Sequence, residues 1–319
     1  MEKKAFPNKD YEQKVDALLA NLRAHPNYSD YLYKENCASL REESLSHSLS
    51  IELNPNEGKK SDHGSLLKKL RTGEQFLEKE GLSVYSLACL GNIVEPSKNP
   101  NPRFRNEDIS FGPFYGSDSS KIYYEVDSLI EFIKSSNLHP LSCAAQSHLE
   151  LVRIHPYSDG NGRIARVLQN YLLHKKGYPS AIITPDDKPT YIALLRNALM
   201  DRLNGKGNLY FPSDNEQEFC NFISEKVLNS TEFLVNQMQD FKLYNLEIHS
   251  TKCPKIVNNI SKEIKRISYG ANHPVKTSVK SSSKKDKSII IYGDIPRGNL
   301  SAIVVKACER YNPIHYSLE

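Results

Sequence analysis

The stretch that organises this chain is HPYSDGNGRIAR, residues 155–166, which lies between two segments with helical periodicity. Leu141 to Ile154 carries its apolar side chains at helical spacing, and Ile164 to Lys176 resumes the same period. Pro156 disfavours helix at the residue before it, and Gly177 ends the second helix. The sequence therefore predicts two helices joined by a polar, glycine-containing turn.

The turn between these helices has the composition of a phosphate-binding site. Gly160 and Gly162 let backbone N–H groups approach a ligand closely, and Asn161 lies between them at a helix start, where the first N–H groups are unpaired. Arg163 and Arg166 lie one helical turn apart, so both guanidinium groups can bind phosphate oxygens from one face. These residues predict a binding site for a nucleoside triphosphate.

We call this predicted phosphate-binding site, formed by residues 160–163 and Arg166, the phosphate cradle. Two further side chains of the turn add chemistry to it. His155 can be neutral near pH 7 and can accept a proton from an attacking hydroxyl. Asp159 is placed to hold Mg²⁺, which prefers few carboxylates together with phosphate oxygens. Taken singly, each of these residue types is more common in a structural role, as a turn, a helix cap or a surface cation. Their combination in one loop and helix favours a catalytic site.

The same stretch resembles the signature of Fic domains, H-x-F-x-(D/E)-G-N-G-R-x-x-R, and departs from it at one position. Tyr157 stands where the family has phenylalanine, whose ring anchors the loop in the core, so the added hydroxyl needs a partner or a route to solvent. The resemblance covers roughly Leu40 to Met238 and excludes the tail. It implies a mainly α fold, a helical bundle with a small β-hairpin flap, followed here by a small C-terminal extension of possible α/β structure.

The resemblance also implies an activity, protein adenylyltransfer. In the family mechanism His155 is the base for a target Ser, Thr or Tyr hydroxyl that attacks the α-phosphorus of ATP, and pyrophosphate leaves. Asp159 binds Mg²⁺ in this mechanism. The expected cofactor is therefore Mg²⁺, the co-substrate is ATP, and the partner is a target protein with a hydroxyl side chain.

The nucleotide contacts that the resemblance implies fall on the turn and on one later helix. The amides of Gly160 to Gly162, together with Asn161, hold the α- and β-phosphates. Arg163 holds the β-phosphate and Arg166 the γ-phosphate. Tyr191 resembles an adenine-pocket tyrosine of the family, and a core aromatic is the alternative interpretation.

A short hairpin is expected ahead of the motif. The residues from Asp108 to Phe111 alternate polar and apolar side chains before a glycine–proline turn. With Phe104-Arg105 before it, this segment resembles the family's flap, which holds a target segment by main-chain pairing. The expected target-docking residues are Ile109, Ser110, Phe111, Gly112 and Tyr115.

Upstream, the segment from Ser48 to Leu53 resembles the family's inhibitory helix, (S/T)-x-x-x-E-(G/N), with Leu53 in place of glycine or asparagine. The resemblance implies that Glu52 pairs with Arg166 and occupies the guanidinium group meant for the γ-phosphate. In some relatives the same glutamate aligns water for removing AMP from a modified protein. Both directions of the reaction therefore stay open, as does a catalytically silent nucleotide-binding module.

The remaining organisation is expected as an N-terminal helical region over 1–64 with the inhibitory helix at about 40–53, a core over 65–240, a basic Ser/Lys-rich linker over 241–288 and a small module over 289–319. Short strands are expected at Ile289–Tyr292 and Ile303–Val305. Helices are predicted from about Tyr11 to Ala38 with an interruption at Pro26, and then at 40–53, 66–77, 82–93, 126–134, 191–203 and 216–238.

Composition limits the remaining function classes. The chain has 319 residues and a net charge of +4, and no stretch approaches the roughly 20 apolar residues that cross a bilayer. The 6 cysteines lie far apart without zinc-ligand spacing, which disfavours structural zinc. Without a secretory h-region, a cytoplasmic location is expected, or delivery as an effector without a conventional signal peptide. For the basic tail over 252–287, a role in target docking or in homo-oligomer contacts is favoured over the binding of nucleic acid.

Overall fold

The computed structural model of the chain describes residues 9–25, 28, 30–52 and 63–239, and beyond them 242–249, 258–260, 262, 276–281, 286–293, 304 and 315–318. The chain divides into two compact units. The first contains Met1–Asn21 and Asp30–Leu234, and the second contains Leu22–Ser29 and Val235–Glu319. The N-terminal helical region therefore shares a unit with the core, and the expected border at residue 64 does not separate compact units.

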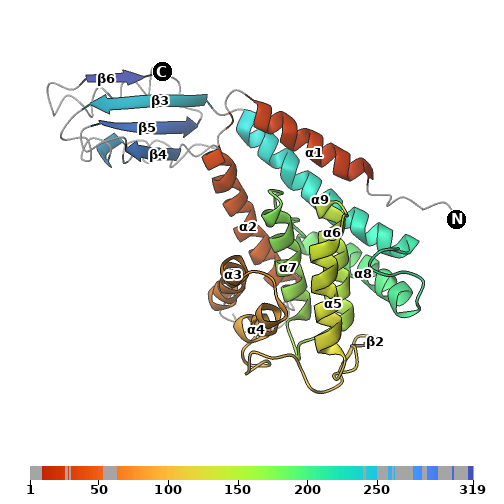
Figure 1. Cartoon of the computed structure of the whole chain (residues 1–319). Helices are drawn as coiled ribbons and strands as arrows, with labels where there is room; N and C mark the ends of the chain where they lie inside the picture. Colours follow the sequence, from red (N-terminus) through yellow and green to blue (C-terminus); the bar gives the residue numbers. More distant parts are fainter. Residues whose placement is uncertain are drawn as a thin grey trace. The chain divides into compact units, whose positions relative to one another are not determined.

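The first unit is built from helices and one small hairpin, so the predicted mainly α fold with a β-hairpin is confirmed (Figure 1). The hairpin strands are β1, Ser110–Phe111, and β2, Phe114–Tyr115, and a short 3₁₀ helix, η1, spans Pro185–Asp187. The helices are α1 Lys9–Ala24, α2 Asp30–Glu52, α3 His63–Glu80, α4 Val84–Val94, α5 Ile122–Ser135, α6 Pro140–Ile154, α7 Asn161–Lys175, α8 Lys188–Leu203 and α9 Asp214–Gln239.

Helix α2 runs without interruption from Asp30 to Glu52, so it joins the predicted stretch that ends at Ala38 to the one that begins at Leu40. Its buried positions include Tyr33, Cys37 and Leu40, which extend the helical period upstream of residue 40. The break between α1 and α2 is therefore short. As a consequence, the segment that resembles the family's inhibitory helix is the last part of a long, packed helix.

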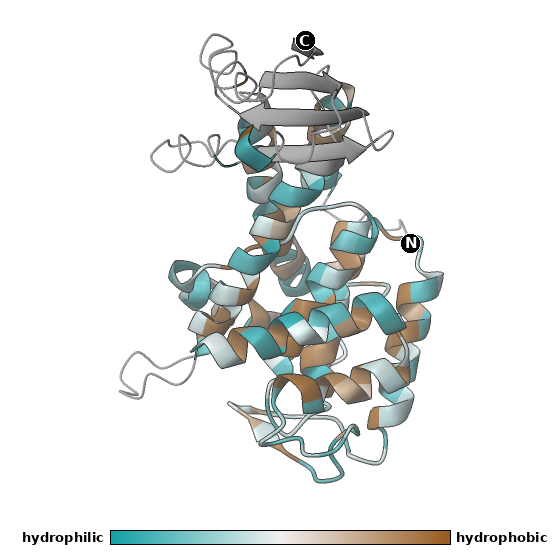
Figure 2. Cartoon of the chain, turned by 90° about the vertical axis from the view of Figure 1, so that its left-hand side faces the viewer, coloured by the Kyte–Doolittle hydropathy of each residue, from teal (hydrophilic) through white to brown (hydrophobic). Residues whose placement is uncertain are grey.

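Helices α6 and α7 lie in the middle of the bundle and are covered on almost every side (Figure 1). In Figure 2 the brown, hydrophobic stretches of the ribbon are most frequent on the helices in the interior of the first unit. Ala144, Ala145 and Ala165 are each 0% exposed, and such small side chains let neighbouring helices approach closely. The two helices that carry the motif are thus held by packing along their whole length.

A buried network of charged side chains braces α6 from α8 and α9. Arg202 donates to Glu150 at 2.6 Å, to Glu216 at 2.5 Å and to Gln146 at 2.6 Å. Glu150 also accepts from Arg153 at 2.8 Å. Buried charges of both signs are satisfied by one another here, so this network fixes the helix that ends at the motif.

The second unit contains a four-stranded antiparallel sheet in the order β4-β5-β3-β6. Its strands are β3 Lys242–His249, β4 Lys276–Ser281, β5 Asp286–Gly293 and β6 His315–Leu318. The predicted strand at 289–292 lies within β5, which confirms it. The predicted strand at 303–305 falls outside the described residues except for Val304.

The prediction of a linker over 241–288 is wrong where β3, β4 and the start of β5 form. The apolar residues Ile289 and Ile291 lie on a central strand, with Ile289 opposite Leu246 on one side and Val279 on the other. A Ser/Lys-rich segment needs only backbone pairing to act as an edge strand, and lysine is common on such edges. Low apolar content alone therefore did not exclude a strand.

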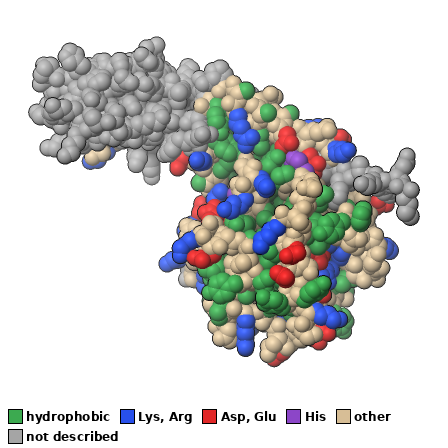
Figure 3. All heavy atoms as spheres, viewed as in Figure 1, with side chains coloured by type: hydrophobic (Ala, Val, Ile, Leu, Met, Phe, Trp, Pro, Cys, Tyr) green, Lys and Arg blue, Asp and Glu red, His purple; other side chains and the backbone are tan. Residues whose placement is uncertain are grey.

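The surface of the first unit carries both signs of charge. On the face seen in Figure 3, basic and acidic side chains are interspersed with hydrophobic ones. Within the described part of the chain, no helix is long and apolar enough to span a membrane.

Candidate nucleotide-binding and transfer site

The motif loop joins the end of α6 to the start of α7 and is bracketed by two left-handed residues. His155 follows α6 with a φ of 53°, the only positive φ outside glycine in the described parts of the chain, and Gly160 precedes α7 with a φ of 87°. A left-handed conformation costs a non-glycine residue roughly 1–2 kcal/mol. The surroundings of His155 must offset this cost.

Tyr157 anchors the middle of the loop in the core, and its hydroxyl has a partner. The residue is 0% exposed, and its hydroxyl donates to the carbonyl of Leu87 at 2.6 Å. A Cβ placed on Gly91 would lie 2.5 Å from the Tyr157 ring, so only glycine leaves room for it. The departure from the phenylalanine of the signature is therefore accommodated by one buried hydrogen bond.

Asn161 and Asn99 tie the loop to itself and to the segment after α4. The Asn161 amide accepts from the Tyr157 N–H at 3.0 Å and donates to the Tyr157 carbonyl at 2.8 Å. Asn99, which lies in a segment rich in turn-forming residues, accepts from the Ser158 N–H at 2.9 Å and donates to the Asp159 carbonyl at 3.0 Å. The Asn161 side chain is thus engaged within the loop itself.

His155 is held as a neutral base. Its ring stacks on Phe111 of the hairpin with 3.8 Å between centroids and 11° between planes. Its Nδ1 lies 3.1 Å from the Val152 carbonyl, and a proton on Nδ1 leaves Nε2 as the proton acceptor. Burial lowers the pKa of His155 to about 4, the Val152 carbonyl opposes this, and the positive charge of Arg105 adds to it.

Asp159 lies at the solvent side of the loop, where its side chain is 50% exposed. One carboxylate oxygen accepts from the Gly160 N–H at 2.6 Å, and the other lies 3.5 Å from Arg163. Among the described residues no three His, Cys, Asp or Glu side chains cluster to hold a metal. A cation bound by Asp159 would therefore take its remaining ligands from phosphates and water, which suits Mg²⁺.

Both arginines of the motif are paired with carboxylates in this structure. Arg163 donates to Glu95 at 3.0 Å, a partner that the sequence did not reveal because Glu95 follows α4, far upstream. Arg166 donates to Glu52 at 2.7 Å, to the Ser48 hydroxyl at 2.8 Å and to the Ser48 carbonyl at 3.1 Å. The two residues of the inhibitory pattern therefore contact the predicted γ-phosphate arginine.

The Glu52 carboxylate also lies over the first turn of α7. A Cβ placed on Gly162 would be 2.8 Å from its Oε1, and no side chain caps this helix end. Burial raises the pKa of Glu52, but the nearby Arg166, Arg163 and Lys188 together hold it below its usual value. The carboxylate therefore occupies a position where the helix terminus and two guanidinium groups stabilise an anion.

Tyr191 lies in the core, which is the alternative interpretation made from the sequence. It is 1% exposed, and its hydroxyl accepts from Arg166 at 3.3 Å and lies 3.0 Å from His148. His148 is 0% exposed, and burial lowers its pKa to about 3. Tyr191 is thus a neighbour of Arg166 rather than an accessible wall of a nucleobase pocket.

The predicted flap residues form the hairpin beside His155. Ser110 pairs with Tyr115 and Phe111 with Phe114, while Gly112 has a φ of 56° in the turn. The Ile109 carbonyl accepts from the Gly116 N–H at 3.0 Å at the base of the hairpin. Tyr115 is 77% exposed, so the hairpin offers an accessible surface next to the candidate base.

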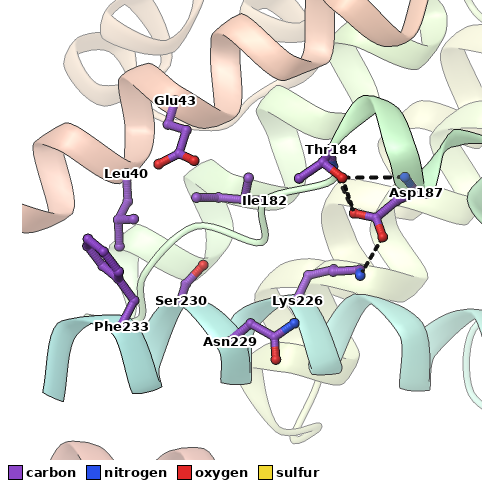
Figure 4. A pocket seen from close by; sticks show the side chains of 9 residues that line it. All are labelled: Leu40, Glu43, Ile182, Thr184, Asp187, Lys226, Asn229, Ser230 and Phe233. Carbon is purple, nitrogen blue, oxygen red and sulfur yellow. Dashed lines mark hydrogen bonds and ion pairs between the residues drawn. The ribbon is translucent and has the colours of Figure 1, made fainter. Parts of the chain in front are cut away.

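A separate pocket of about 360 Å³ lies between α2, the segment around η1 and α9 (Figure 4). Lys226 and Asp187 form an ion pair of 2.7 Å on one side of it, and Phe233 lies at its other end (Figure 4). No residue of the motif loop or the hairpin lines this pocket. The candidate site is therefore the loop, the start of α7, the end of α2 and the hairpin.

Comparisons with known sequences point to one family. Residues 86–173 match the model of the Fic/DOC family. A segment of 64 residues is 48% identical to a protein adenylyltransferase Fic from Drosophila persimilis, and the alignment covers 20% of this chain and 13% of that protein. A relative of the same name from Drosophila melanogaster gives the same identity and coverage. The similarity thus spans a small part of these longer proteins.

Solved structures share the fold over a larger part of the chain. A Fic domain containing signaling protein from Bacteroides thetaiotaomicron has a TM-score of 0.59 at 19% identity, covering 71% of this chain and 98% of that one. A Fic family protein from Desulfovibrio desulfuricans has a TM-score of 0.58 at 15% identity, covering 97% and 85%. These neighbours support the fold. Residues 86–173, which run from α4 to α7 and include the motif loop, therefore match the Fic/DOC family, and the fold around them resembles that of solved Fic proteins.

Proposed function

We propose that this site transfers AMP from ATP to a hydroxyl group of a target protein. The observation that carries the proposal is the arrangement around the start of α7, where a neutral His155, an exposed Asp159 and two guanidinium groups surround an uncapped helix terminus. A polyphosphate fits this arrangement because the helix terminus and the guanidinium groups favour an anion beside a proton acceptor, and Asp159 could hold a cation that bridges to the phosphates. The matching relatives named protein adenylyltransferases support the same reaction class.

In the proposed reaction, Nε2 of His155 takes the proton of a Ser, Thr or Tyr hydroxyl while its oxygen attacks the α-phosphorus of ATP. The bond from the α-phosphorus to the bridging oxygen breaks, and pyrophosphate leaves with the electron pair. Arg163, Arg166 and the first N–H groups of α7 stabilise the charge on the phosphates. Asp159 would hold Mg²⁺, which supplies positive charge to the phosphates when bound.

The contact between α2 and Arg166 supports a second part of the proposal, autoinhibition by Glu52. The Arg166 guanidinium donates to Ser48, Glu52 and Tyr191, so its donors are already engaged by protein atoms. A γ-phosphate at Arg166 would have to displace the Glu52 carboxylate. ATP that binds without this displacement would lie in an unproductive pose, which lowers the rate of transfer.

Removal of AMP from a modified protein is the second candidate function, and one observation favours it. The Glu52 side chain is 45% exposed although its carboxylate lies against the start of α7. A carboxylate in contact with both solvent and the phosphate cradle can align a water molecule for attack on a phosphorus atom. The two functions predict mass changes of opposite sign on a target protein.

The proposal is tested by incubating the full chain with labelled ATP and Mg²⁺ and measuring self-labelling by mass spectrometry. We expect slow labelling of the wild type, faster labelling of Glu52→Gly, and none of His155→Ala, which should still bind ATP. Glu42→Gly is the matched control, because it makes the same change on α2 at a carboxylate whose partner is Arg71. Labelling that survives in His155→Ala would exclude His155 as the base. An unchanged rate in Glu52→Gly would exclude autoinhibition by Glu52. Loss of a pre-installed AMP group would instead identify the removal reaction.

A further inference from the structure

A buried cation, Arg105, lies between the hairpin and the motif loop. Its side chain is 1% exposed, although arginine is rarely buried without a carboxylate partner. The nearest carboxylate is that of Asp108, which is 3.9 Å away and 73% exposed. The guanidinium instead donates to main-chain carbonyls, those of His155 at 2.7 Å, Glu107 at 2.5 Å, Ser117 at 2.6 Å and Ile154 at 3.4 Å.

These acceptors come from both sides of the site. Glu107 and Ser117 flank the hairpin, whereas Ile154 and His155 are the end of α6 and the candidate base. Two main-chain bonds run in parallel, from the Arg105 N–H to the Pro156 carbonyl at 3.0 Å and from the Ser117 N–H to the Ile154 carbonyl at 3.1 Å. One side chain and two backbone bonds therefore join the hairpin to the loop.

Gly116 provides the space for this junction. A Cβ placed on Gly116 would lie 2.5 Å from Nη2 of Arg105 and 3.1 Å from Cβ of His155. Any larger residue must displace the guanidinium, the imidazole or both. The requirement for glycine here is steric, because Gly116 is not among the residues with positive φ.

The bond to the His155 carbonyl acts on the one strained residue of the loop. Because His155 has a φ of 53°, its backbone would relax unless neighbouring groups hold it. Arg105 is bonded both to this carbonyl and to the preceding one, that of Ile154. The direction of the imidazole ring follows from the backbone that Arg105 fixes.

We propose that Arg105 is a positioning residue for His155, which locks the backbone of the base to the hairpin so that a target segment held there meets the base in one geometry. This inference rests on the proposed function for its effect on rate. Among the described residues, the hydrogen-bond partners of the Arg105 side chain belong to the hairpin region and the end of α6 and not to residues 160–166, so its loss should leave nucleotide binding intact. A misplacement of about 1 Å can lower a rate on the order of 10²-fold.

Arg105 has a second, electrostatic effect on the same imidazole. Burial is the main cause that lowers the pKa of His155, and the Arg105 charge acts in the same direction. The Val152 carbonyl, Asp159 and Glu52 face the ring as well and raise its pKa. Removing the positive charge at position 105 should therefore raise the pKa of His155 toward its ordinary value of about 6.5.

The test compares Arg105→Lys, which keeps the charge and loses the forked bonds, with Arg105→Gln, which loses both. In the full chain with Glu52→Gly, we expect both to reduce the maximal self-labelling rate on the order of 10²-fold with an unchanged ATP concentration at half-maximal rate. Only Arg105→Gln should show a further drop between pH 7 and pH 5. Arg103→Gln is the matched control, because Arg103 is exposed.

A readout without turnover separates this inference from the proposed function. The ¹⁵N resonances of the His155 imidazole, followed against pH, should give a higher pKa in Arg105→Gln than in Arg105→Lys or the parent, with thermal melting above the assay temperature in each. If the parent labels nothing while the resonances shift as expected, the proposed function fails, and the charge contact between Arg105 and His155 stands without it. Equal pKa values in all variants, or loss of ATP affinity together with rate, would overturn the role of Arg105.

Discussion

The hydroxyl of Tyr157 should contribute a small, measurable amount of stability and nothing to transfer. It donates to the Leu87 carbonyl at 2.6 Å in a fully buried position, so Tyr157→Phe removes one donor. Because Leu87 lies inside α4, its carbonyl has a helical partner of its own and is not left unsatisfied. The expected loss is therefore that of one net hydrogen bond, about 0.5–1.5 kcal/mol.

Thermal unfolding and self-labelling test this expectation together. For a unit of this size, 1 kcal/mol corresponds to a shift in melting temperature of roughly 2–4 °C. Tyr124→Phe, at a tyrosine that is 74% exposed, is the matched control and should leave melting unchanged. A loss of several kcal/mol in Tyr157→Phe would mean that the hydroxyl supports more than one bond. A lower labelling rate in fully folded Tyr157→Phe would show that the Tyr157 hydroxyl orders the motif loop for the transfer reaction.

Three other changes follow from the packing and the charges. Arg202→Ala should lower the free energy of unfolding by roughly 3–5 kcal/mol in denaturant titrations, because it leaves buried carboxylates such as Glu216 unpaired. Gly91→Ala should cost roughly 1–3 kcal/mol or more, since its Cβ would overlap the buried Tyr157 ring; unchanged melting would contradict this. The labelling rate of Glu52→Gly should stay level from pH 8 to pH 5 and fall only toward pH 4, because protonated His155 cannot accept a proton; a fall near pH 6.5 would contradict the pKa of about 4.

The motif loop was predictable because its information is local. Helical periodicity before residue 155 and after residue 163, with glycine at 160, indicates a helix, a turn and a helix without any knowledge of the rest of the chain. The placement of Ser48 and Glu52 against Arg166 agrees with the geometry that the family resemblance implied. That they inhibit transfer stays a prediction.

The residues that hold the loop in place were not predictable in the same way. Glu95, Asn99 and Arg105 lie in a loop of turn formers and polar residues, where such side chains are usually solvated. Each reaches the motif only through the tertiary fold, as the contacts to Arg163, Ser158 and His155 show. The residue pattern of a single sequence does not indicate which side chains far apart along the chain will contact one another.

The two carboxylates on the motif arginines differ in a way that bears on regulation. The Glu95 side chain is 12% exposed and its partner Arg163 is 10% exposed, so separating them would leave charges in a poorly hydrated place. The Glu52 side chain is 45% exposed, and water can solvate its carboxylate as it leaves Arg166. Displacement by a phosphate therefore costs less at Arg166 than at Arg163. In the proposed mechanism, Glu95 keeps Arg163 aimed at the cradle throughout, and Glu52 is the carboxylate that exchanges with the nucleotide.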